Sequence, residues 1–217
     1  MSDDVADRTL RASRLILASH SPRRLALMRE YGYKCEVVEP HIPEPASLGE
    51  GLTPAQRAEA LSYFKARSVA TLITDGVILA GDTVVSLSGR VFGKPVDRDD
   101  ARIILSALSG TTHDVITGVT LLDASTEARL IQHDLTAVTM KPMSEAQLEA
   151  YLDTGAWAGK AGAYGIQDHG DAFIERIEGS FTNVVGFPME LVARMLGQWG
   201  IQAGEDPAGP TARITDP

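Results

Sequence analysis

Two long runs of β-branched and apolar residues in the middle of the chain constrain its fold more than any other feature. Residues 112–122 and 130–140 flank a polar turn at residues 123–129. Runs of this composition around a turn predict a hairpin of long antiparallel strands. Shorter strands are expected at residues 15–18, 34–38, 76–82, 84–87, 90–92 and 172–177. Helical segments fall between them, so the sequence predicts an α/β fold with a mixed sheet.

Capping residues mark where the helices begin and end. Ser21 and Pro22 begin a helix that Gly32 ends. Thr53 and Gln56 have the spacing of a capping box, so a second helix should run to about residue 70. Further helices are expected at residues 97–108, 144–155 and 183–197, the last with Pro188 early in it.

The composition narrows the classes of function. With 20 basic and 29 acidic residues among 217, the net charge is −9. A chain of this charge is a poor ligand for nucleic acid polymers or anionic membranes, but a few local cations can still bind a small anion. There is one cysteine, Cys35, and no apolar run approaches the length of a membrane span. A cytoplasmic location is therefore the expectation.

Asp82 is the leading candidate for chemistry. It follows the apolar residues 77–80 and Gly81, so a strand is expected to deliver a carboxylate to its carboxyl end. The alternative is that Asp82 caps a turn, and the stretch by itself does not decide between the two.

Cations and acids recur at the predicted helix starts and strand ends. Arg23 and Arg24 lie in a first helical turn, where the helix dipole favours an anion; the alternative is that they are two surface arginines. Acids and cations at such positions suit metal-assisted chemistry on a polyphosphate. The set comprises Glu39, Glu44, Asp82, Arg23, Arg24, Lys65, Lys94 and Lys160.

Six motifs occur in order at residues 17–24, 81–85, 93–95, 108–113, 160–168 and 179–188. Together they resemble the signature motifs of the Maf family of nucleoside triphosphate pyrophosphatases. The resemblance covers residues 14–200, which leaves a flexible arm at residues 1–13 and a disordered tail at residues 201–217 as expectations. It implies an inosine-triphosphatase-like fold: an elongated mixed sheet flanked by helices, with two lobes around a cleft.

The resemblance also implies an activity and a site. The activity is hydrolysis of a nucleoside triphosphate to the monophosphate and pyrophosphate, with Mg²⁺ or Mn²⁺ as cofactor. Asp82 matches the proton acceptor, and Glu44 with Asp82 is expected to hold the metal. The positions that match substrate-binding residues are Ser21, Arg23, Arg24, Lys65, Thr83, Lys94 and Gln167.

Three of these positions separate branches of the family. Arg23, Thr83 and Gln167 resemble the branch that prefers dTTP and UTP, and the amide of Gln167 could pair with a pyrimidine edge. His20 departs from the small residue that is usual at its position, beside the phosphate-facing turn.

Two other functions stay open from the sequence. One is a nucleotide-binding regulator of cell division and septum formation that acts without turnover. The other is a phosphomonoesterase with a phospho-aspartate at Asp82, which the lack of a second Asp at short spacing disfavours. A homodimer is also left open.

Overall fold

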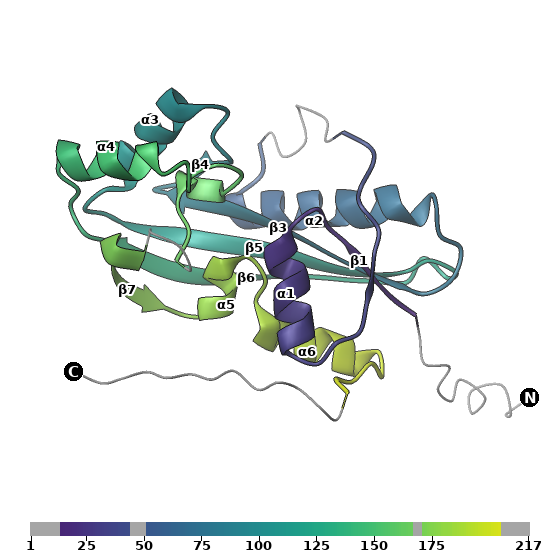
Figure 1. Cartoon of the computed structure of the whole chain (residues 1–217). Helices are drawn as coiled ribbons and strands as arrows, with labels where there is room; N and C mark the ends of the chain where they lie inside the picture. Colours follow the sequence, from purple (N-terminus) through teal and green to yellow (C-terminus); the bar gives the residue numbers. More distant parts are fainter. Residues whose placement is uncertain (1–13, 44–50, 167–170, 205–217) are drawn as a thin grey trace, which may run out of the picture.

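A computed structural model describes residues 14–43, 51–166 and 171–204 of the chain. The predictions for residues 1–13, most of the tail, Glu44 and Gln167 lie outside this part. The described residues form one seven-stranded mixed sheet with six α-helices around it (Figure 1). No helix in these ranges is long and apolar enough to cross a membrane.

The predicted hairpin is the centre of the sheet. β5 (Thr112–Asp123) and β6 (Arg129–Met140) pair antiparallel along their length. β3 (Val77–Leu87) pairs antiparallel with β5, and β1 (Leu15–Ala18) pairs parallel with β3. β2 (Glu36–Val37) and β7 (Ile174–Glu178) close the two edges, and β4 (Arg90–Phe92) pairs with the end of β3. The mixed sheet that the sequence predicts is confirmed.

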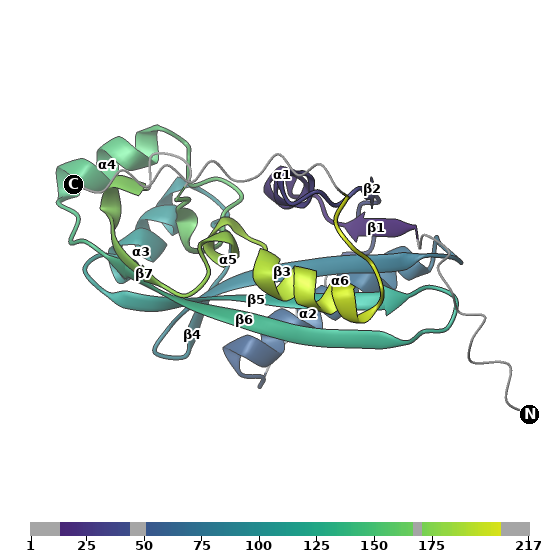
Figure 2. The same cartoon turned by 90° about the horizontal axis from the view of Figure 1, so that it is seen from below.

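Helices cover both faces of the sheet. α2 (Pro54–Ala70) lies along one face, and α1 (Pro22–Glu30), α5 (Phe181–Val185) and α6 (Met189–Gln198) lie on the other (Figure 2). α3 (Arg98–Leu108) and α4 (Glu145–Asp153) lie together at one end of the molecule. The capping boxes that begin α2 and α4 are both formed, as the sequence predicts.

The alternation of β3 side chains explains how the two faces are filled. Ile78 and Ala80 pack with α2 residues, whereas Val77 and Leu79 belong to the larger core on the opposite face. Along the same pattern, Asp82 belongs to the α2 face and Thr83 to the other face. The two neighbours therefore have different surroundings.

Three predicted elements need correction. The strand expected at residues 76–82 does not end at Asp82: β3 continues to Leu87, because β5 pairs with it through Ser86. The helix expected at residues 183–197 is two helices, since Gly186 takes a φ of 128° and Pro188 is the N-cap of α6. The strand expected at residues 34–38 is reduced to two exposed edge residues, which pair only with Ile16 and Leu17.

Candidate active site

The site is at a gap in the pairing of β3. β5 pairs with one edge of β3 from Val77 to Ser86. On the other edge, β1 pairs only as far as Ala80, and β4 begins to pair at Val85. Residues 81–84 of that edge thus have no strand partner among the described strands, and Asp82 lies in this gap.

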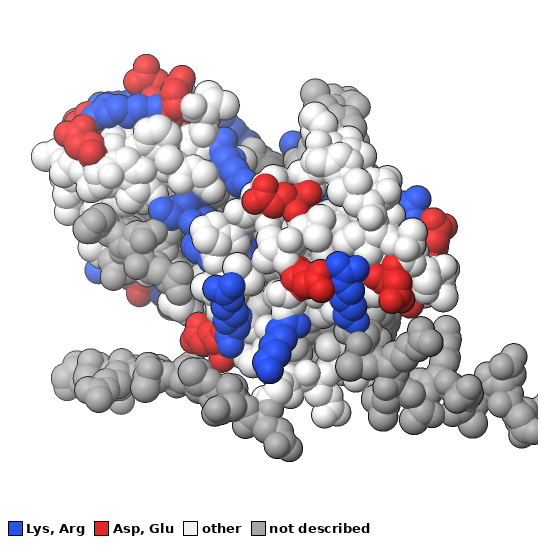
Figure 3. All heavy atoms as spheres, turned by 45° about the vertical axis from the view of Figure 1, so that its right-hand side comes forward, with Lys and Arg blue, Asp and Glu red and all other residues white. Residues whose placement is uncertain are grey.

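A pocket of about 430 Å³ opens at the gap. Because the edge is open there, the pocket reaches Asp82 of one face and Thr83 of the other. Val85, Val115 and the turn at Gly186 supply apolar and backbone parts of the lining, and Gly159, Lys160 and Tyr164 also line the pocket. Figure 3 shows Lys and Arg side chains along the hollow beside the α3–α4 end of the molecule.

The structure brings together every predicted site residue that it describes. Each of them lines the pocket: Ser21, Arg23, Arg24, Lys65, Asp82, Thr83 and Lys94. They come from α1, α2, β3 and the segment after β4. The remaining two, Glu44 and Gln167, lie outside the described residues.

Asp82 is paired with a lysine. Lys65 on α2 forms an ion pair with the Asp82 carboxylate, and the two side chains are only 15% and 13% exposed. The pairing needs α2 to lie close to the sheet, which Gly118 permits. Gly118 is the cross-strand partner of Asp82, and a Cβ atom there would lie 2.2 Å from the Ala58 carbonyl oxygen of α2. Because residue 118 is a glycine, α2 can pack closely enough on the sheet for Lys65 to reach Asp82.

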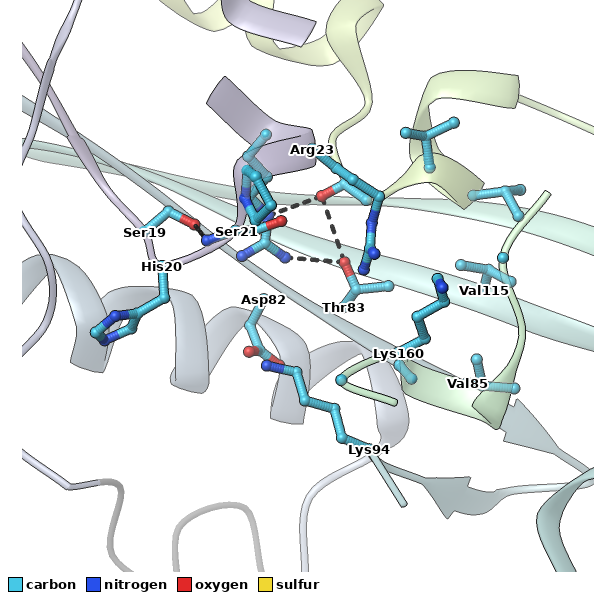
Figure 4. Close-up of a pocket in the computed structure, with 18 of the residues that line it drawn as sticks. Ser19, His20, Ser21, Arg23, Asp82, Thr83, Val85, Lys94, Val115 and Lys160 are labelled. Carbon is cyan, nitrogen blue, oxygen red and sulfur yellow. Dashed lines mark hydrogen bonds between the residues drawn. The ribbon is translucent and has the colours of Figure 1, made fainter. Parts of the chain in front are cut away.

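More cations surround the pocket. Figure 4 shows Lys94 pointing toward Asp82, while Arg23 and Lys160 extend from opposite sides of the pocket beyond Thr83. Lys160 is buried, and its amine donates a hydrogen bond to the Ala156 carbonyl. Cations on several sides of one carboxylate suit a ligand with several negative charges.

The start of α1 supplies polar groups to the same pocket. Ser21 is the N-cap residue, but its side chain makes no capping hydrogen bond, and its backbone N–H donates to Ser19 Oγ at 3.1 Å. The neighbouring His20 faces the loop before α2: its Nε2 lies 2.9 Å from the Pro40 carbonyl oxygen and its Nδ1 3.1 Å from a Glu39 carboxylate oxygen.

Arg24 makes its hydrogen bonds to the protein. Its Nη1 donates to the Gly81 carbonyl at 2.7 Å, its Nη2 to Thr83 Oγ1 at 3.0 Å, and its Nε to the Gly186 carbonyl at 2.8 Å. The Gly81 carbonyl is on the part of β3 that β1 no longer reaches, so the guanidinium replaces the missing strand partner. The prediction that Arg24 binds substrate remains a prediction.

Behind the pocket is a buried aromatic pair. Tyr164 lines the pocket, and its hydroxyl lies 2.7 Å from His113 Nε2. Burial lowers the pKa of His113 to about 4, so the imidazole is neutral near pH 7. Burial also raises the pKa of Tyr164 above its ordinary value. A neutral pair of this kind fixes the ring of Tyr164 without adding charge to the site.

The described part of the pocket offers a divalent metal one carboxylate, Asp82. Within the described ranges no three His, Cys, Asp or Glu residues lie close enough together to hold a metal. Asp82 is the carboxylate of the pocket. Mg²⁺ commonly binds through one or two carboxylates and substrate phosphates, so this donor set suits a metal that is completed by a phosphorylated substrate.

Sequence reasoning did not find Thr117 or Val115, and it included Gly186 in the motif at residues 179–188 without predicting a turn there. Thr117 faces Thr83 across the β3–β5 ladder, and Gly186 separates α5 from α6. Their roles depend on strand register and on the break between two helices, which no motif spacing reveals.

A family model and several named relatives each match most of the chain. A family model described as "Maf-like protein" matches residues 14–199. A dTTP/UTP pyrophosphatase of Pelotomaculum thermopropionicum is 41% identical over 186 residues, which cover 86% of this chain and 96% of the relative. A dTTP/UTP pyrophosphatase of Moorella thermoacetica is 43% identical over 189 residues, 87% of this chain and 96% of the relative.

Proposed function

This chain belongs to the Maf family, as its motifs predicted, and from this premise we propose that it is a nucleoside triphosphate pyrophosphatase. It hydrolyses its substrate to the nucleoside monophosphate and pyrophosphate, with dTTP and UTP preferred. The names of relatives about 40% identical over most of the chain support this activity. The observation that carries it is a paired, largely buried carboxylate in a pocket with cations on several sides.

Each of these pocket residues has a separate role in the proposed hydrolysis. The side chains of Arg23, Lys94 and Lys160 neutralise the phosphates and orient them. Asp82 accepts a proton from the attacking water, whose oxygen forms a bond to the α-phosphorus. The bond from the α-phosphorus to the bridging oxygen breaks, and pyrophosphate leaves. Lys65 holds the Asp82 carboxylate in place through their ion pair.

We also propose that the reaction uses Mg²⁺ or Mn²⁺, held by Asp82, substrate phosphates and Glu44. Such an ion would neutralise negative charge that develops on the phosphate oxygens. Asp82 is suited to this because it lies at the pocket beside the expected phosphate-binding cations.

The base preference is proposed to depend on Arg23, Thr83 and Gln167. Arg23 and Thr83 line the same pocket, which supports their joint action. A cytoplasmic location and a homodimer are further parts of the proposal. The single cysteine suits a reducing compartment, and light scattering of the full chain would measure the oligomeric state.

A substrate panel tests the activity. The full chain is incubated with Mg²⁺ and dTTP, UTP, CTP or 7-methyl-GTP, and the products are separated by ion-exchange chromatography. We expect monophosphate and pyrophosphate in equal amounts, formed fastest from dTTP and UTP. Release of orthophosphate alone, or no turnover of any nucleotide, would contradict the proposal.

A further inference from the structure

Thr83 is expected to help select the base, yet its hydroxyl already has partners within the protein. It accepts a hydrogen bond from Arg24 Nη2 at 3.0 Å and shares one with Thr117 Oγ1 at 2.9 Å. It also lies 3.5 Å from the Gly186 carbonyl oxygen. These three contacts use the one donor and two acceptor positions of a hydroxyl. Little capacity remains for a hydrogen bond to a nucleotide.

Thr117 supports this arrangement from beneath the pocket. It is the direct cross-strand partner of Thr83, and it is fully buried. It does not line the pocket, so it cannot touch a substrate there. Its hydroxyl hydrogen bond is to Thr83.

Arg24 connects this pair to the catalytic carboxylate. Its guanidinium binds the Gly81 carbonyl on one side of Asp82 and the Thr83 hydroxyl on the other. The same group binds the carbonyl of Gly186, so α1, β3 and the α5–α6 turn meet at one side chain. Arg24 thus holds both chain neighbours of Asp82 from the edge that β1 and β4 leave unpaired, while β5 pairs with the other edge.

We propose that Thr83 and Thr117 are positioning residues that act on the reaction through Arg24, so that Thr83 affects base preference through the position of Arg24 and not through a hydrogen bond to the base. Thr117 holds the hydroxyl of Thr83, Thr83 orients Arg24, and Arg24 fixes Asp82 and the Gly186 wall of the pocket. This inference rests on the proposed function, because it concerns the residue that activates water in that reaction.

Valine and serine substitutions at both threonines test the inference. Valine keeps the shape and removes the hydroxyl, whereas serine keeps the hydroxyl. We expect T83V and T117V each to lower kcat for dTTP about tenfold or more, with KM changed less than twofold. T83S and T117S should retain most of the wild-type kcat. The double variant T83V/T117V should be no slower than the slower single variant, since both substitutions break one network.

Thr120 provides a matched control. It is a fully buried threonine of the same strand, and its hydroxyl bonds to Ser62 on the α2 face, away from Arg24. T120V should lose stability, as T117V does, but keep kcat within twofold of the wild type. Thermal unfolding and circular dichroism of every variant separate loss of fold from loss of rate.

Three results would overturn the inference. The first is a T117V enzyme with wild-type kcat beside a slow T83V enzyme, which would mean that Thr83 contacts substrate directly. The second is a double variant whose loss equals the product of the two single losses. The third is a T120V enzyme as slow as T117V. A wild-type enzyme that turns over no nucleotide would instead contradict the proposed function itself.

Discussion

Lys65 and Asp82 form the ion pair on which the proposed chemistry depends. Because both side chains are largely buried, removing the Lys65 charge leaves the Asp82 carboxylate without its ion-pair partner in a poorly solvated place. The carboxylate can then shift toward Lys94, which points toward it (Figure 4). The sequence predicted both residues as members of the site, but it did not predict that they form an ion pair. They are 17 residues apart, and they meet only because α2 packs on β3.

Replacing Lys65 with Met should therefore lower kcat/KM for dTTP by at least about tenfold, since it removes the charge and keeps the length. Lys65→Arg, which keeps the charge, should retain more activity than Lys65→Met. Steady-state kinetics on both variants make the comparison. A Lys65→Met enzyme with wild-type kcat/KM would show that the ion pair is dispensable.

His113 predicts a pH dependence of stability. Burial lowers its folded pKa from 6.5 to about 4, so the folded state disfavours the protonated ring. Above pH 6.5 the neutral ring costs the folded state nothing. As the pH falls from 6.5 toward 4, the unfolded chain binds a proton that the folded protein does not, and the free energy of unfolding falls by about 3 kcal/mol. Urea unfolding of wild type and His113→Gln between these pH values measures the difference. Parallel pH curves for the two proteins would argue against a buried neutral imidazole.

At the scale of elements, the packing of α2 on β5 decides where Lys65 lies. The glycine at position 118 allows this close approach, and sequence alone presents it only as a glycine within a strand. The strand register puts Gly118 opposite Asp82 and against Ala58 of α2, which shows that the glycine is needed for close packing of the helix. Motif reasoning named the catalytic candidates but could not supply this contact, which is a property of two packed elements.

Gly118→Ala should destabilise the fold by about 3 kcal/mol or more, because its Cβ atom would overlap the backbone of α2. It should also lower activity by displacing Lys65. Gly197→Ala is the control: that glycine lies in α6, its added Cβ atom meets nothing within 4 Å, and alanine should stabilise the helix by up to about 1 kcal/mol. Thermal unfolding of both variants measures the difference. A Gly118→Ala protein as stable as the Gly197→Ala protein would refute the need for a glycine at position 118.

The break between α5 and α6 shows why one predicted helix was wrong. Periodic apolar residues on both sides of Pro188 suggest a continuous helix, but Gly186 adopts a φ of 128° and turns the chain. The turn brings Phe187 against Gly81, where a Cβ atom would lie 2.8 Å from the ring. Tertiary packing on β3 therefore overrides the local pattern.

For the whole molecule, the sequence was sufficient to predict the mixed sheet, its central hairpin and the family. These follow from periodicity, caps and ordered motifs, all of which are local signals. The gap on the β1 side of β3 was not predictable, because it depends on where β1 ends and β4 begins relative to Asp82. The sequence instead suggested that the strand stops at Asp82, which would also place a carboxylate at an open edge.

Metal removal is a prediction for the assembled site. Treatment of the full chain with EDTA should abolish turnover of dTTP, and added Mg²⁺ or Mn²⁺ should restore it. The physical reason is that a triphosphate needs its charge balanced by more than the cations of the pocket. Full activity in EDTA would remove the metal from the proposed mechanism.

The position at which water attacks tests the central claim most directly. The full chain is incubated with dTTP and Mg²⁺ in water enriched in ¹⁸O, and the products are examined by mass spectrometry. Attack at the α-phosphorus predicts that the label enters dTMP and that the pyrophosphate stays unlabelled. Label in the pyrophosphate, or in orthophosphate, would contradict the account.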